Sequence, residues 1–202
     1  MPPHDPRKVP RQRRARETVR AILDATAHIL RQDESLTTNR VAEVAGVSIG
    51  SLYQYFPDKD ALVAALVERT LAEDLAWVAD QLEPGPLRPQ VPHLIEAICT
   101  RQRANAALLA SLLPRLPVIE RDALARQAFS TMAKWLRDRL IQEPGLRPEL
   151  ADEVRLDQAV FVVMRALRWV LNEAALEQPE WLDTPGFRAE VSRIVEGLWD
   201  PA

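Results

Sequence analysis

The sequence predicts an all-α protein of about nine helices, because two observations along the chain agree. Apolar residues recur at spacings of three and four, and no stretch alternates apolar and polar residues as a β-strand would. The chain holds 16 prolines and only 6 glycines, and prolines stand between the periodic stretches, where they end helices. With 202 residues, 47% of them hydrophobic, the chain has enough apolar material for the cores of one or two domains.

The first segment, residues 1–14, is predicted to be a basic arm without fixed structure. Residues 1–10 carry four prolines and little apolar content. Residues 1–20 contain seven basic and two acidic side chains, although the whole chain has a formal net charge of -3. A basic end on an acidic body attracts phosphate through its local potential, whatever the total charge is. The alternative is a tail that is merely solvated.

A first helix is predicted at residues 15–31, where apolar residues form one stripe at helical spacing. Two short helices joined by a tight turn then follow, at 39–45 and 49–56. The residues that bound them are the capping residues Thr37, Thr38 and Ser48, the turn residue Gly46 and the stop Pro57. This order is typical of a helix-turn-helix, in which the second helix enters the major groove of DNA. We assign packing roles to Val41, Ala42, Ala45, Val47 and Leu52.

The residues of this stretch also follow a specific order. It contains Thr37-Thr38, Val41-Ala42, Ala45-Gly46-Val47-Ser48, Gly50-Ser51-Leu52-Tyr53, Tyr55-Phe56, Lys59 and Ala61-Leu62, in order and without gaps. The segment 15–66 thereby resembles the N-terminal DNA-binding domain of the TetR family of bacterial transcriptional regulators. The resemblance implies that the DNA-contacting positions are Thr38, Asn39, Ser48, Ile49, Gly50, Ser51, Tyr53, Tyr55 and Lys59.

Side-chain chemistry suggests a role for each position. Phosphate oxygens suit the hydroxyls of Thr38, Ser48 and Tyr53 and the ammonium group of Lys59. Gly50 permits close approach to the groove floor, Ile49 suits a thymine methyl group, and Ser51 and Tyr55 suit base edges. For Tyr53 and Tyr55 the alternative is half-buried packing. Ahead of this motif, we expect Arg11, Arg13 and Arg14 to contact the DNA backbone or the minor groove.

A linking helix, capped by Asp58, is predicted at residues 59–82. We place the DNA-binding domain at 15–62 and a helical effector-binding and dimerisation domain at 63–202. The proline-rich segment 83–92 is predicted to be a loop inside this second domain. Further helices are predicted at 90–103, 105–113, 119–142, 149–177 and 185–199, with Thr184 capping the last.

The resemblance also implies a small-molecule effector and a dimer. Large apolar residues mixed with a few polar ones predict a pocket lined by some of Trp77, His93, Ile98, Cys99, Leu112, Phe129, Met132, Trp135, Met164 and Arg165. The stretch 160–171 is apolar almost all round, so it needs burial on every side. We therefore predict a four-helix dimer interface that includes Val163, Leu167, Val170, Leu171, Val191, Ile194 and Leu198. The alternative is that these residues fill the core of one protomer.

Enzyme function is not predicted. The three histidines and the single cysteine show no metal-ligand spacing, and there is no glycine-rich phosphate loop or nucleophile elbow. We expect no cofactor and no metal ion, and we interpret Cys99 as a small buried residue. One cysteine, no signal-like start and no long apolar run favour a cytoplasmic protein without a membrane span.

The leading hypothesis is a homodimeric regulator on a near-palindromic double-stranded operator, a repressor released by a largely apolar effector. The alternative is a helical interaction or co-activator module that keeps the fold without binding DNA. An acidic recognition face or a missing basic arm would support that alternative, and the sequence shows neither. The effector, the operator, the sign of regulation and the roles of Arg165 and Arg168 stay open at this point.

Overall fold

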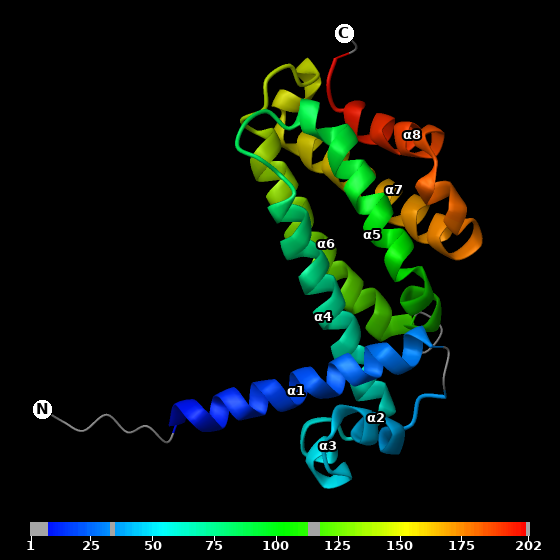
Figure 1. Ribbon diagram of the computed structural model, residues 1–202. Helices are drawn as coiled ribbons and strands as arrows, with labels where there is room; N and C mark the ends of the chain where they lie inside the picture. Colours follow the sequence, from blue (N-terminus) through cyan, green and yellow to red (C-terminus); the bar gives the residue numbers. More distant parts are fainter. Residues whose placement is uncertain (1–7, 33–34, 113–117, 201–202) are drawn as a thin grey trace, which may run out of the picture. The chain divides into compact units, whose positions relative to one another are not determined.

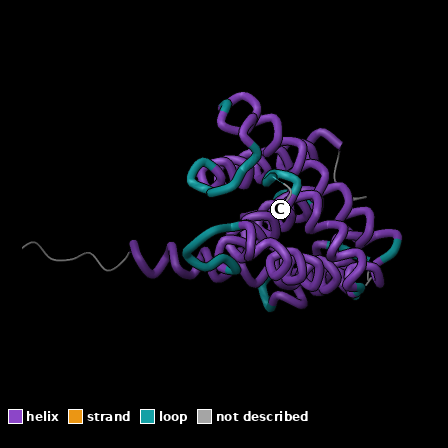
Figure 2. Tube along the Cα trace, turned by 90° about the horizontal axis from the view of Figure 1, so that it is seen from above, coloured by secondary structure: helices purple, strands orange, loops and turns teal. Residues whose placement is uncertain are grey.

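Helices form all the regular structure in the computed structural model, which describes residues 8–32, 35–112 and 118–200 (Figure 1). Within these ranges there are eight α-helices and no strand, as the all-α prediction requires (Figure 2). The chain divides into two units, each with its own packing. The first unit comprises residues up to Arg69 and residues 111–121, and the second comprises 70–110 and 122 onward.

The first unit is built from α1 (Lys8–Arg31), α2 (Thr38–Ala45), α3 (Ile49–Tyr55) and the start of α4 (Lys59–Asp80). Its core is apolar and fully buried, with Ile22, Ile29, Leu30, Leu52, Leu62 and Leu66 contributing the largest side chains. An ion pair joins α1 to α4, with Arg69 Nη1 at 2.7 Å from Asp24 Oδ1. These contacts hold α2 and α3 in place on the longer helices.

α1 begins at Lys8, seven residues before the predicted start. Proline is tolerated in the first turn of a helix, so Pro10 does not prevent this. The exposed pair of Arg13 and Glu17, one turn apart with Nε to Oε1 at 2.9 Å, also favours the helical conformation. Positions 11, 13 and 14 therefore lie in the first turns of α1.

The second unit contains the rest of α4, then η1 (Arg88–Gln90), α5 (Val91–Leu112), α6 (Val118–Leu140), η3 (Pro148–Ala151), α7 (Glu153–Glu177), η4 (Pro179–Asp183) and α8 (Pro185–Glu196). Its core gathers Val91, Ile95 and Cys99 from α5, Leu136 and Leu140 from α6, and one side of α7. α8 packs on α7, and its cap is Thr184, whose Oγ1 accepts the N–H of Phe187 at 3.4 Å.

One predicted helix break is wrong. α5 runs without interruption from Val91 to Leu112, where the sequence had suggested two helices separated at residue 104. Neither proline nor glycine lies between Pro92 and Leu112, so nothing in the local sequence stops the helix. The remaining predicted boundaries of the second unit agree with the structure to within a few residues, except that η3 precedes α7.

The proline-rich loop between α4 and α5 is fastened to the end of α6. The carboxylate of Glu143 accepts the N–H of Leu87 at 2.7 Å and the N–H of Arg88 at 3.2 Å. Arg139 Nη2 donates to the carbonyl oxygens of Glu83 at 3.1 Å and Gly85 at 2.8 Å. We call this set the loop clamp. It satisfies backbone groups that a loop without helical hydrogen bonds would otherwise leave unpaired.

Candidate nucleic-acid interface

The turn between α2 and α3 is made by local hydrogen bonds. Thr37 caps α2, because its Oγ1 accepts the N–H of Arg40 at 3.2 Å. Gly46 adopts a left-handed φ of 66°, as predicted for the turn residue. Ser48 then caps α3, and its Oγ accepts the N–H of Ser51 at 3.0 Å. α3 ends at Tyr55, just before the extended Phe56 that precedes Pro57.

One face of this motif is buried and the other is exposed. Val41, Ala42 and Leu52 are buried, in agreement with their assignment to packing, and Ala45 and Val47 are half-buried. Tyr53 is 50% exposed, and Ile49 and Tyr55 are exposed too. Tyr53 and Tyr55 thus keep 50% and 39% of their surface in water and have the rest covered by the protein. Large apolar and aromatic groups held in water at this place are available to a partner.

The exposed face collects the predicted residues from both helices. Thr38 from α2 and Tyr53 from α3 meet through their hydroxyl oxygens at 3.1 Å. The hydroxyl oxygens of Ser48 and Ser51 lie 2.8 Å apart at the start of α3. On α2, on α3 or at the start of α3, with exposed or half-buried side chains, lie Thr38, Asn39, Ser48, Ile49, Gly50, Ser51, Tyr53 and Tyr55. Lys59 is exposed at the start of α4, next to Asp58, whose Oδ1 accepts the N–H of Ala61 at 2.8 Å.

The predicted basic contact residues lie on α1, a different helix from those that form this surface. Arg13 and Arg14 are exposed on the helix, and the side chain of Arg11 lies outside the described side chains. Arg40, which the sequence reasoning did not single out, is half-buried on α2 beside Asn39 and pairs with Glu43 at 3.2 Å. Its position next to a predicted contact residue was the signal available in the sequence.

The predicted effector residues do not form one group. Trp77, Ile98, Met132, Trp135 and Met164 are half-buried in the second unit. Cys99 belongs to the core, where burial raises the pKa of its thiol to about 11. His93 and Arg165 are exposed, Leu112 belongs to the first unit, and the side chain of Phe129 lies outside the described ones. Sequence reasoning missed Arg101, whose guanidinium lies 4.8 Å from the centre of the Trp77 ring.

The predicted dimer residues fall into two groups. Val163, Leu171, Val191 and Leu198 are buried in the core of their own protomer, and Leu167, Val170 and Ile194 are half-buried. Because α7 is apolar on nearly every side, the sequence did not show which side faces inward. The exposed side carries Val154, Phe161, Val162, Trp169 and Leu176. We call this set the outer stripe of α7.

Among the described residues, no helix is both long enough and apolar enough to cross a membrane. Within the same part of the chain, no three His, Cys, Asp or Glu side chains are grouped so that they could hold a metal ion.

Residues 22–66 match the family model for "Bacterial regulatory proteins, tetR family". The nucleoid occlusion factor SlmA of Haemophilus ducreyi is 37% identical over 57 residues, which cover 27% of this chain and 28% of that protein. The chain therefore matches well under a third of that relative's length. SlmA of Marinobacter nauticus is 24% identical over 190 residues, which cover 89% of this chain and 94% of that protein.

Solved structures share the fold over most of the chain. A tetR family transcription regulator from Shewanella sp. PV-4 gives a TM-score of 0.63 at 18% identity, covering 91% of this chain and 99% of that one. FadR from Bacillus subtilis in complex with stearoyl-CoA gives a TM-score of 0.55 at 18% identity, covering 89% and 97%. Residues 22–66 thus match the N-terminal domain of the tetR family of bacterial regulatory proteins, and the chain as a whole shares the fold of the solved structures.

Proposed function

We propose that the chain is a homodimeric transcription regulator that binds operator DNA through α3 and is released by a small, largely apolar effector, so that it acts as a repressor in the bacterial cytosol. The observation that carries this proposal is the exposed face of α3 on a domain that matches the tetR family. The match of residues 22–66 to that family supports a DNA-binding regulatory role. The homodimer, the operator, the effector, the sign of regulation and the location in the cytosol are all parts of the proposal.

Gly50 supports the entry of α3 into a groove. It is exposed, and a Cβ atom built at this position would meet only Ser48 Oγ, at an ordinary 3.9 Å. The fold therefore does not require a glycine here, and glycine is a poor helix former. A missing side chain at the start of α3 instead suits close approach of the helix to base edges. Ile49 beside it offers an apolar contact for a thymine methyl group.

The phosphate contacts would surround this entry point. Tyr53, Thr38 and Ser48 supply hydroxyl donors, and Lys59 supplies a charge at the start of α4. Backbone N–H groups at the start of α3 add further donors of the kind that bind anions. Contacts to phosphate fix the register of the helix, while Ile49, Ser51 and Tyr55 would read the bases.

The outer stripe of α7 supports the dimer. Its members recur along the exposed side of the helix from Val154 to Leu176, a length of about 33 Å at 1.5 Å per residue. Trp169, its most exposed member, is 70% exposed. A monomer gains nothing from holding five large apolar side chains in water, whereas a second copy would cover them with the same surface.

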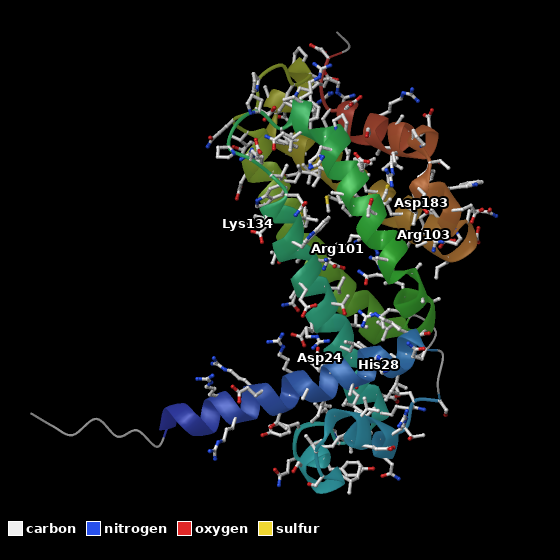
Figure 3. The ribbon with its side chains drawn as sticks, viewed as in Figure 1. Asp24, His28, Arg101, Arg103, Lys134 and Asp183 are labelled. Atoms are coloured by element: carbon white, nitrogen blue, oxygen red, sulfur yellow. The ribbon has the colours of Figure 1, made fainter. Side chains whose placement is uncertain are left out.

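The test is fluorescence anisotropy with labelled duplex DNA from upstream of the chain's own coding sequence. We expect log K to fall linearly with log salt between about 50 and 200 mM, because bound phosphates release counterions. Tyr53→Ala combined with Lys59→Ala should weaken binding strongly. Lys134→Ala removes an exposed lysine of α6, labelled in Figure 3, and serves as the control for lost charge. Full affinity in the double variant would exclude α3 as the DNA-binding helix.

A second candidate is a nucleoid occlusion factor, which the match to the Marinobacter nauticus protein over 190 residues favours. Such a protein would bind many chromosomal sites, whereas a local repressor would bind one or a few operators. Mapping of bound DNA across the chromosome by immunoprecipitation and sequencing separates the two. Binding confined to the promoter of a neighbouring gene would favour the repressor.

A further inference from the structure

The body half of α4 leaves its apolar side chains incompletely covered. From Thr70 to Asp80, no residue of this helix is buried, although Leu71, Leu75, Trp77 and Val78 are apolar and only half-exposed. In the same unit α7 buries six residues along its inner side. Half-buried Ile98 of α5 and Trp135 of α6 pack against the edge of the core. Apolar surface that the fold leaves half-exposed gains free energy when an additional apolar group covers it.

An ion pair between α4 and α5 stands among these side chains. Arg101 of α5 donates through Nε to Asp74 Oδ1 of α4 at 2.7 Å, and its Nη2 lies 2.6 Å from the same oxygen. The guanidinium carbon is 4.8 Å from the centre of the Trp77 ring, also on α4. Figure 3 labels Arg101 on α5, beside α4. Trp77 and Asp74 thus hold the charged end of Arg101 at a defined place.

Solvent reaches the ion pair of Arg101 and Asp74, and the pairing does not offset the whole cost of burying the Asp74 carboxylate. The side chains of Arg101 and Asp74 keep 30% and 35% of their surface exposed. Burial raises the pKa of Asp74, and this effect outweighs the opposing hydrogen bond from Arg101. Asp74 is therefore costly to keep ionised in this surrounding. An arginine presents planar donors to any carboxylate, so a carboxylate from outside competes with Asp74 on equal chemical terms.

We infer that Arg101 receives the carboxylate of an amphiphilic effector whose apolar body lies against Trp77 and Ile98, in exchange for Asp74. Ile98 is three residues before Arg101 and lies on the same side of α5. The exchange removes the ion pair that ties α5 to α4, the helix whose first residues, from Lys59 to Arg69, belong to the first unit. This inference rests on the proposed ligand-responsive function and gives that ligand a chemical class.

Three probes with the same apolar chain and different head groups test the class: decanoate, 1-decanol and decyltrimethylammonium. Each is titrated below its micelle concentration into the full chain, and binding is followed by isothermal titration calorimetry. We expect decanoate to bind more tightly than decanol by about tenfold or more, the effect of one charge-assisted hydrogen bond. Equal affinity for decanol would show an apolar site without a head-group contact and would overturn the inference.

Variants locate the contact. Arg101→Gln should weaken decanoate binding about tenfold while leaving decanol binding unchanged. Asp74→Asn should tighten decanoate binding, because the competing carboxylate is gone. Arg103→Gln is the matched control, since Arg103 lies on the same helix and pairs instead with Asp183, at 3.3 Å. Circular dichroism checks that each variant is folded. If Arg101→Gln does not fold, the affinity of Asp74→Asn for decanoate decides the outcome.

The opposite results are informative as well. Tighter binding of decyltrimethylammonium, lost in Asp74→Asn, would make Asp74 and Trp77 a site for cations and overturn the inference. Binding of none of the probes would leave the pair as a plain link between helices. DNA binding is measured separately by anisotropy. If DNA binds and decanoate does not, the inference fails alone. If decanoate binds through Arg101 and DNA does not bind, the proposed function fails alone.

Discussion

Two hydroxyl groups from different helices form a hydrogen bond on the exposed face of the helix-turn-helix. Thr38 and Tyr53 are separated by 15 residues, and their oxygens are 3.1 Å apart. Each hydroxyl can donate one hydrogen bond and accept others, so either can point its proton outward. A phenol is the stronger donor, which favours Thr38 donating to Tyr53 and Tyr53 donating to a phosphate. Chained hydrogen bonds of this kind strengthen one another.

This arrangement predicts coupled effects on DNA affinity. Tyr53→Phe should weaken binding by about 0.5–1.5 kcal/mol, the worth of one hydrogen bond. Thr38→Val should weaken binding in the parent protein but add little to Tyr53→Phe, whereas Thr38→Ser should behave like the parent. A double-mutant cycle by fluorescence anisotropy measures this coupling. Additive losses would show that each hydroxyl meets DNA independently.

Hydrogen bonds between residues close along the chain could be predicted from the sequence. The caps Thr37, Ser48, Asp58 and Thr184 bond to an N–H three residues ahead, and the structure confirms all four. The pairing of Thr38 with Tyr53 and that of Asp74 with Arg101 both join different helices. Such partners depend on how helices pack, which no local pattern records. The chemistry of the exposed face could therefore be predicted, but its internal hydrogen bonds could not.

At the scale of elements, prolines and caps predicted helix ends better than apolar spacing predicted helix faces. The ends of α3 and the start of α8 follow from Pro57 and from Thr184-Pro185. By contrast, α7 is apolar around most of its circumference, so periodicity indicated a buried helix without indicating its inner side. The side became clear only from the residues that α8, η3 and η4 cover.

The loop clamp gives a prediction at this scale. Glu143→Ala should lower the free energy of unfolding by about 1–3 kcal/mol, because the N–H of buried Leu87 loses its acceptor. Urea unfolding followed by circular dichroism measures the change. Glu17→Ala, which removes an exposed pair within α1, is the control and should change stability by less than about 0.5 kcal/mol. Equal effects of the two substitutions would deny the clamp a structural role.

For the whole molecule, the outer stripe of α7 predicts that two copies of the chain form a dimer. Trp169→Glu places a charge in the middle of this stripe and should shift the chain from dimer to monomer in light scattering coupled to size exclusion. Burying an unpaired carboxylate against a second copy is costly, whereas leaving it in water is not. DNA affinity should fall with it, because two linked recognition helices bind more tightly than one.

Ala107→Glu adds the same charge at an exposed position of α5 and is the matched control. It should leave both the mass in solution and the DNA affinity as in the parent chain. A Trp169→Glu protein that remains dimeric would place the interface elsewhere. Circular dichroism should show that both variants are folded, since neither position belongs to the core.

The length of α3 limits how much sequence the protein can recognise. Seven residues extend about 10 Å, which matches about three base pairs at roughly 3.4 Å each. Three fully specified base pairs recur by chance about once in 64 positions, and two such readings about once in 4,000, against a genome of about a million or more competing sites. Direct contacts of a dimer would then leave hundreds of equivalent addresses. A protein selective for one operator must therefore also recognise the spacing of the half-sites and the shape of the DNA between them. Without that recognition, it would bind many chromosomal sites.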